Sequence, residues 1–101
     1  MTFGFRETNS AIKYILGAAD KAQELIVELH QRDPANVTFE QVGFLNGHEI
    51  IKDYINHNEW LLALEHLLYM IHESDISFPD DVLAELHELA RHNGIPNEYA
   101  K

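Results

Sequence analysis

Hydrophobic residues recur at helical spacing along most of the chain. Over residues 8–31, positions three and four apart form one apolar stripe, made of Ile12, Ile15, Leu16, Ala19, Ala22, Ile26, Val27 and Leu29. This spacing predicts an amphipathic helix that follows an irregular lead over residues 1–7. Residues 8–10, Thr-Asn-Ser, are N-cap candidates, and Pro34 ends the helix because proline disfavours helical geometry in the residue before it.

Two further helical segments follow this first helix. A short turn over residues 39–45, with Thr38 as its cap and Gln41 in the capping-box position, is either separate or the start of the next helix. That next helix is predicted over residues 47–57. Its connection to the following segment is so short that the two helices must be antiparallel neighbours.

The segment NEWLLALEHLLYMIHES, from Asn58 to Ser74, is apolar on almost all sides, as is typical of a helix at the centre of a domain. We expect Asn58 to be its N-cap and Glu59 to lie in its first turn. The sector opposite its main apolar side holds Leu62, Glu65, His66, Tyr69 and Glu73. In that sector Leu62 and Tyr69 are either covered by a neighbouring helix or form an apolar anchor with an acidic rim for a partner.

The last helix follows the sequence ISFPDD. Ser77 with Asp80 resembles a capping box, and Pro79 suits a first-turn position. The inward positions are Val82, Leu83, Leu86, Leu89 and Ala90. The helix is expected to end at Gly94, with Ile95 making the hydrophobic contact of a Schellman motif.

No segment alternates with a period of two, so the sequence predicts an all-α fold. We expect residues 1–101 to form a single helical domain. It would be a compact bundle of four main helices around a buried central helix at about residues 59–74, with a fifth short helix if the turn at residues 39–45 is separate. The apolar run of this central helix is too short to span a bilayer, which needs about 20 residues.

The net charge of the chain narrows the classes of partner that the protein can bind. Seventeen acidic residues stand against seven Lys and Arg, a net charge of −10, and between Glu49 and Glu88 the only base is Lys52. Such a field repels phosphate backbones and anionic membranes and attracts basic partners. We therefore expect no direct nucleic-acid or membrane binding. The absence of cysteine and of a secretory signal fits a cytoplasmic protein.

Three acidic stripes are the predicted partner-binding residues. They follow helical spacing and comprise Glu49, Asp53 and His57; Glu65, Tyr69 and Glu73; and Asp81, Glu85 and Glu88. Periodicity alone does not place the three stripes on one surface.

Catalytic and metal sites are not predicted. The sequence contains no Glu-x-x-His, no His-Glu-x-x-His and no glycine-rich phosphate loop. Its serines have helix-end explanations, and a raised carboxyl pKa at Asp80-Asp81 would require burial that the pattern does not suggest. We expect no catalytic residue, no metal and no cofactor.

The segment from Ile50 to Ile95 resembles small, acidic, helical immunity proteins of bacterial polymorphic toxin and contact-dependent growth inhibition systems. The residues that carry the resemblance are Tyr54, Ile55, His57, Glu59 and Trp60, then Leu62 to Glu65, then Glu73, Asp75 and Ile76, and finally Gly94-Ile95. The resemblance implies a non-catalytic inhibitor in the cytoplasm of the producing cell. Such a protein binds the C-terminal domain of its cognate toxin, often a nuclease whose basic cleft an acidic surface can cover. It implies no particular contact residue.

Two alternatives stay open. We expect a monomer in a 1:1 complex, but Leu62 and Tyr69 would equally suit a homodimer. Glu59-Trp60 with Ala63 and Leu64, and a break near Pro79, also resemble one tetratricopeptide-type hairpin, which implies a peptide-binding adaptor or regulator. Against the adaptor, the chain shows no second copy at a 34-residue period. The charge of the partner distinguishes the inhibitor from the adaptor, because the inhibitor requires a basic toxin domain and the adaptor would bind a short peptide.

Overall fold

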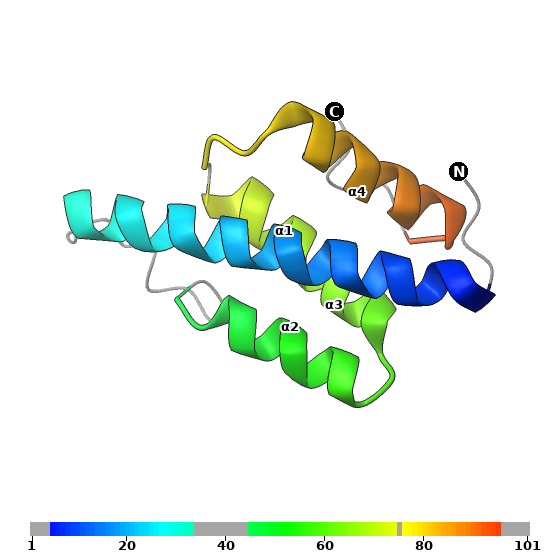
Figure 1. The fold of residues 1–101 in the computed structure, drawn as a ribbon. Coiled ribbons are helices and arrows are strands. Elements are labelled where there is room, and N and C mark those ends of the chain that lie inside the picture. The colour runs from blue at the N-terminus through cyan, green and yellow to red at the C-terminus, as the bar shows by residue number, and fades with distance from the viewer. Residues whose placement is uncertain (1–4, 34–44, 75, 96–101) are drawn as a thin grey trace.

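The computed structural model describes residues 5–33, 45–74 and 76–95, which form four helices and no strand. The helices are α1 (Phe5–Arg32), α2 (Gly47–Asn56), α3 (Trp60–Ser74) and α4 (Asp80–His92), as Figure 1 shows. The predicted all-α bundle is confirmed. The short turn expected at residues 39–45 lies outside the described residues, apart from its last position.

α3 lies at the centre of the bundle. α1 crosses one side of α3, and α2 and α4 lie along its two flanks (Figure 1). The residues of the shared core that are fully buried and largest are Ile15, Ile26, Ile51, Leu64, Leu67, Met70, Leu86 and Leu89. All four helices contribute to this list, and α3 contributes the most. The side of α3 that faces away from α1 is left uncovered by the described residues.

α1 starts earlier than predicted. It begins at Phe5, so the expected irregular lead through residue 7 and the caps at residues 8–10 are wrong. Ser, Thr and Asn cost only some tenths of a kcal/mol in a helix interior, and burial of Ala11 and Ile15 holds the following turns against the core. Half of the predicted apolar stripe is buried, three of its residues are partly buried, and Val27 is 36% exposed.

Asn58 follows His57, the C-cap of α2, and does not cap α3, contrary to the prediction. Its φ of 59° places it in the left-handed region, which asparagine tolerates better than most residues. The N–H of Asn58 donates to the carbonyl of Ile55 (3.1 Å) and the N–H of Glu59 donates to that of Tyr54 (2.8 Å). This is the bonding pattern of a Schellman motif. Glu59 consequently lies before the first turn of α3, so the prediction that it lies within that turn is wrong.

The predicted start of α4 is wrong and its predicted end is confirmed. Pro79 is the N-cap residue and no side chain caps the helix, so the capping box expected from Ser77 and Asp80 is wrong. At the other end, Gly94 has a φ of 74°, and the N–H of Ile95 donates to the Ala90 carbonyl (3.0 Å). Ile95 packs against the core, so the predicted Schellman motif is confirmed.

Gly47 of α2 lies directly against Met70 of α3. A Cβ atom at this position would overlap the sulfur and methyl group of Met70, which is fully buried. Gly47 therefore allows the two helices to pack together. Gly17 differs, because no atom lies within 4 Å of the place where its Cβ would be.

We expect Gly47→Ala to lower the free energy of unfolding by about 1 kcal/mol or more, since the buried thioether of Met70 would have to shift to admit the new methyl group. Gly17→Ala is the matched control and should raise it by about 0.5–1 kcal/mol through helix propensity. Urea denaturation followed by circular dichroism measures both values. Equal changes in the two variants would contradict the close approach at Gly47.

Candidate functional site

The outward side of α3 carries an exposed apolar residue between two acids. Leu62 is 41% exposed, and Glu65 and Glu73 are exposed on the same sector. Because α1 packs against the buried side of α3 (Figure 1), this sector lies on the opposite surface of the molecule. No described residue forms an ion pair with Glu65 or Glu73. We call Leu62, Glu65, Tyr69 and Glu73 the α3 face.

Tyr69 is more covered than Leu62. It is half-buried and packs against the core, and its ring centroid lies 5.6 Å from that of His66. Of the two apolar residues predicted to point to the charged side, Leu62 is thus available as an anchor. The partly buried side chain of Tyr69 lies on the same sector of α3.

The α2 stripe is exposed but partly neutralised. Glu49, Asp53 and His57 are all exposed. The ring nitrogen Nδ1 of His57 lies 2.8 Å from the Asp53 carbonyl oxygen and 3.6 Å from its carboxylate. The hydrogen bond to the Asp53 backbone, and then the Asp53 charge, raise the pKa of His57 above its usual value. A histidine more readily protonated beside Asp53 weakens the negative field of this stripe.

The α4 stripe faces α1 and therefore a different surface. The pKa of Tyr14 on α1 is raised by partial burial and by the negative charges of Glu85 and Asp81. Val82 of the same helical turn lines one groove together with Tyr14, so the start of α4 lies against α1 on this side. The structure accordingly separates the α4 stripe from the α3 face, which lies on the far side of α3 from α1.

Glu88 is already paired within α4. The Arg91 guanidinium donates to both of its carboxylate oxygens, with Nε 3.2 Å from Oε2, and Nε2 of His92 lies 3.0 Å from Oε1. The hydrogen bond from Arg91 lowers the pKa of Glu88. Of the three acids in this stripe, Asp81 and Glu85 are the two with no ion pair to a described residue.

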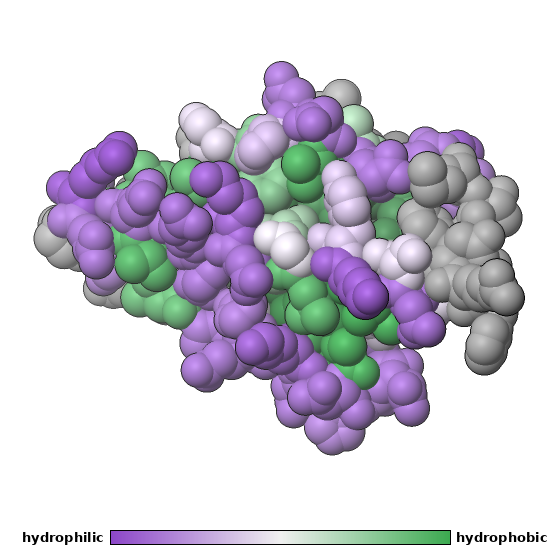
Figure 2. Space-filling model, in the orientation of Figure 1, coloured by the Kyte–Doolittle hydropathy of each residue, from purple (hydrophilic) through white to green (hydrophobic). Residues whose placement is uncertain are grey.

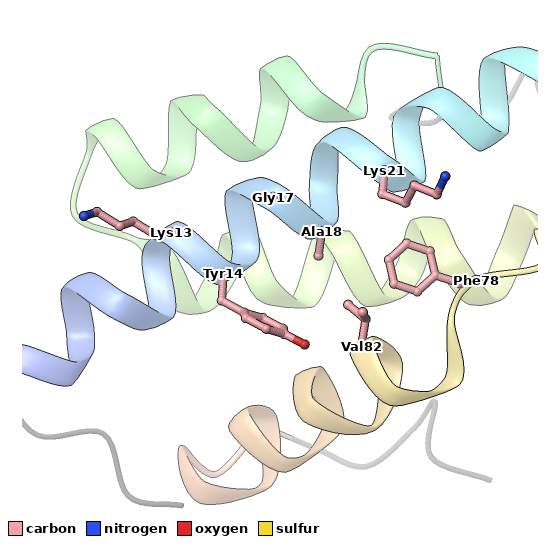
Figure 3. Close-up of a pocket in the computed structure, with 7 residues that line it drawn as sticks. All are labelled: Lys13, Tyr14, Gly17, Ala18, Lys21, Phe78 and Val82. Atoms are coloured by element: carbon pink, nitrogen blue, oxygen red, sulfur yellow. The ribbon is translucent and has the colours of Figure 1, made fainter.

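A groove of about 320 Å³ lies between α1 and the start of α4, lined by Lys13, Tyr14, Gly17, Ala18, Lys21, Phe78 and Val82. Figure 2 views this side of the molecule, where apolar and weakly polar atoms gather between hydrophilic ones. In Figure 3 the side chains of Tyr14 and Val82 point into the space between the two helices. We call this the α1–α4 groove.

Our sequence reasoning missed Tyr14 and the groove. The signal was present, because positions 14, 17, 18 and 21 follow the i, i+3, i+4, i+7 spacing of a second helical face. The small residues Gly17 and Ala18 made that face inconspicuous beside the main apolar stripe of α1.

Two histidines connect α3 and α4. The Nε2 atoms of His72 and His87 lie 3.0 Å apart, at the distance of a hydrogen bond in which one ring donates and the other accepts. Burial lowers the pKa of His87. At the α1–α2 contact, His48 donates its backbone N–H to Gln23 (2.9 Å) and its ring pairs with Asp20.

Metal and membrane sites were searched over residues 5–33, 45–74 and 76–95. Within these ranges no group of three or more His, Cys, Asp or Glu residues is placed to hold a metal ion. None of the helices there is long and apolar enough to cross a bilayer. Comparison with protein-family models, curated proteins and solved structures finds no match to the chain.

The two histidines with shifted pKa values predict opposite pH effects on stability. The pKa of His87 is lower in the folded chain, so the unfolded chain binds more protons there, and stability falls as the pH drops below about 6.5. The pKa of His57 is raised, so its contribution is present below about 6.5 and is lost as the pH rises through the folded value.

We expect His87→Gln to reduce the loss of stability between pH 7 and pH 5, and His57→Gln to increase it. Urea midpoints measured at several pH values test both variants. NMR titration of the two imidazoles gives their pKa values directly. A higher pKa for His87 than for His57 would contradict the assignment.

Proposed function

We propose that the protein is a non-catalytic binding protein that presents the α3 face to a basic protein domain. The observation that carries the proposal is the exposure of Leu62 between Glu65 and Glu73, with no helix of the described residues covering it. Interfaces favour an apolar anchor surrounded by a polar rim. A rim of unpaired carboxylates suits Lys and Arg on the partner.

The acidity of the chain supports the same kind of partner. A net charge of −10 speeds the encounter with a basic domain and slows the encounter with an acidic one. Neither carboxylate of the α3 face must break an ion pair with a described residue before it binds. Such a surface therefore gains the attraction of a basic partner without first losing a pairing of its own.

We further propose that the partner is a bacterial toxin domain, and that the protein is its immunity protein in the cytoplasm of the producing cell. The resemblance of residues 50–95 to such inhibitors supports this identity, and the acidic surface fits a toxin with a basic nuclease cleft. Covering that cleft would block access of its RNA or DNA substrate without any chemistry by the inhibitor.

Co-purification from the bacterium that encodes the protein tests the function. The tagged protein is captured at low salt, and we expect an equimolar basic domain whose nuclease activity falls as the protein is added back. Recovery of a short-peptide-bearing or regulatory protein would contradict the proposal and favour the adaptor. A captured nuclease that stays fully active would contradict inhibition.

Charge reversal tests the α3 face. Glu65→Lys with Glu73→Lys should lower the association rate with the captured partner by about tenfold and flatten its dependence on salt. The matched control is Glu24→Lys with Glu28→Lys, two exposed positions on α1 that change the net charge equally. Stopped-flow measurement over a range of ionic strengths provides the rates. Equal effects of the two pairs would show that net charge, and not this face, controls association.

Leu62 itself is tested by truncation. Leu62→Ala should weaken binding by about 1–2 kcal/mol, mainly through faster dissociation, because an anchor at the centre of an interface loses its contacts. Val27→Ala, at the comparably exposed Val27 of α1, should change binding by less than about 0.5 kcal/mol. Calorimetry gives both affinities. A Leu62→Ala affinity equal to that of the native chain would exclude the anchor.

A further inference from the structure

Two imidazole rings meet where α4 lies along the flank of α3 (Figure 1). Nε2 of His72 on α3 lies 3.0 Å from Nε2 of His87 on α4, and the ring centroids are 5.1 Å apart. Both side chains are half-buried, and each follows a buried core residue, Ile71 in α3 and Leu86 in α4. The packing of the two helices therefore holds the two nitrogen atoms together.

A contact of this length between two ring nitrogens requires a proton or a metal ion between them. Without one, each nitrogen would direct a lone pair at the other. With a proton, one ring donates a hydrogen bond and the other accepts it. Neutral imidazole is also the commonest metal ligand in proteins, and it suits Zn²⁺, Cu²⁺ and Ni²⁺. The pair can therefore share a metal ion in place of the proton.

The distance between the two Nε2 atoms matches the spacing of two imidazoles on one metal ion. Zn–N bonds of about 2.0–2.1 Å place two ligand nitrogens roughly 2.9–3.4 Å apart, for angles at the metal between about 90° and 110°. The observed 3.0 Å lies within this range. Small rotations about the side-chain bonds would be enough to direct both lone pairs at one point.

The surroundings of the pair admit a cation. Both rings are partly exposed, so water can reach the metal and complete its coordination. Arg91 lies one turn after His87, but its guanidinium is directed at Glu88. The net charge of −10 raises the local concentration of cations. Such a site has two protein ligands on separate helices, so it differs from the groups of three or more ligands that are absent from the described residues.

We propose that His72 and His87 together bind one divalent transition-metal ion of the Zn²⁺ and Cu²⁺ class through their Nε2 atoms, with water in the other coordination positions. The ion takes the place of the shared proton. The ring that donated carries its proton on Nδ1 instead of Nε2, so both rings stay neutral and no proton is lost overall. The bound ion links α4 to α3. This site does not depend on the proposed function, since it involves no partner.

The test uses the untagged, metal-free native chain with Zn²⁺ as the probe. We expect calorimetry to show one site with a dissociation constant on the order of 10–100 µM, because only two protein ligands hold the ion. At about ten times that concentration the melting temperature should rise by about 5–10 °C, since the unfolded chain does not hold the two rings together. In NMR spectra, Zn²⁺ should shift the imidazole signals of His72 and His87 together and leave those of His57 unchanged.

Variants and other ions separate this site from general cation binding. His72→Gln and His87→Gln each leave one imidazole and should weaken Zn²⁺ binding at least about tenfold. The matched control is His57→Gln, which removes an exposed imidazole from α2 and should bind Zn²⁺ as the native chain does. Mg²⁺ prefers oxygen ligands and should raise the melting temperature no more than NaCl of the same ionic strength. Cu²⁺ should bind more tightly than Zn²⁺, and its electron paramagnetic resonance spectrum should show two nitrogen ligands.

Three results would overturn the proposal: native Zn²⁺ affinity in His72→Gln or His87→Gln, equal stabilisation by Mg²⁺ and Zn²⁺, or unchanged imidazole signals of His72 and His87 when Zn²⁺ is added. The last would show that the pair is a hydrogen bond only. It is measured on the native chain, so it decides the question even if a glutamine variant does not fold. No toxin domain takes part, so failure here leaves the α3 face and its partner untouched.

Discussion

Burial of α3 is the constraint on which the other helices depend. α1, α2 and α4 each place part of their apolar side against it, and the fully buried residues of all four helices meet there. Among the described residues, three helices cover three sides of α3 and none covers the fourth. The residues on that side are polar apart from Leu62 and the half-buried Tyr69. The α3 face is thus a direct consequence of how the core is completed.

The distribution of charge separates acids that the fold already uses from those left for other molecules. Glu88 is paired with Arg91 and His92, and Asp53 lies beside a histidine whose pKa it raises. Glu65, Glu73, Asp81 and Glu85 have no such pairing within the described residues. Even an exposed ion pair contributes little to the stability of a fold, and a carboxylate without an ion pair contributes less. These four carboxylates are therefore not needed to stabilise the fold. Their cost is mutual repulsion between like charges.

Much of the fold was predictable because apolar periodicity records which side of each helix is buried. The inward residues of α4 and the Schellman motif at Gly94 were read correctly from the sequence. Caps were less predictable: Asn58 suits both a helix start and a left-handed helix end, and the hydrogen-bond pattern decides between them. The helical periodicity of residues 60–74 also predicted correctly that Leu62 lies on the exposed side of α3. Whether stripes on separate helices meet depends on interhelical packing, which places the start of α4 against Tyr14 of α1.

The α3 face and the α1–α4 groove are separated by the buried side of α3. Residues on the two surfaces are on opposite sides of the core, and such sites usually make additive contributions to free energy. A substitution in one surface therefore leaves the energetics of the other nearly unchanged. A chain with this architecture can alter one surface during evolution while the other keeps its properties. The central helix therefore separates two surfaces whose sequences are free to diverge at different rates.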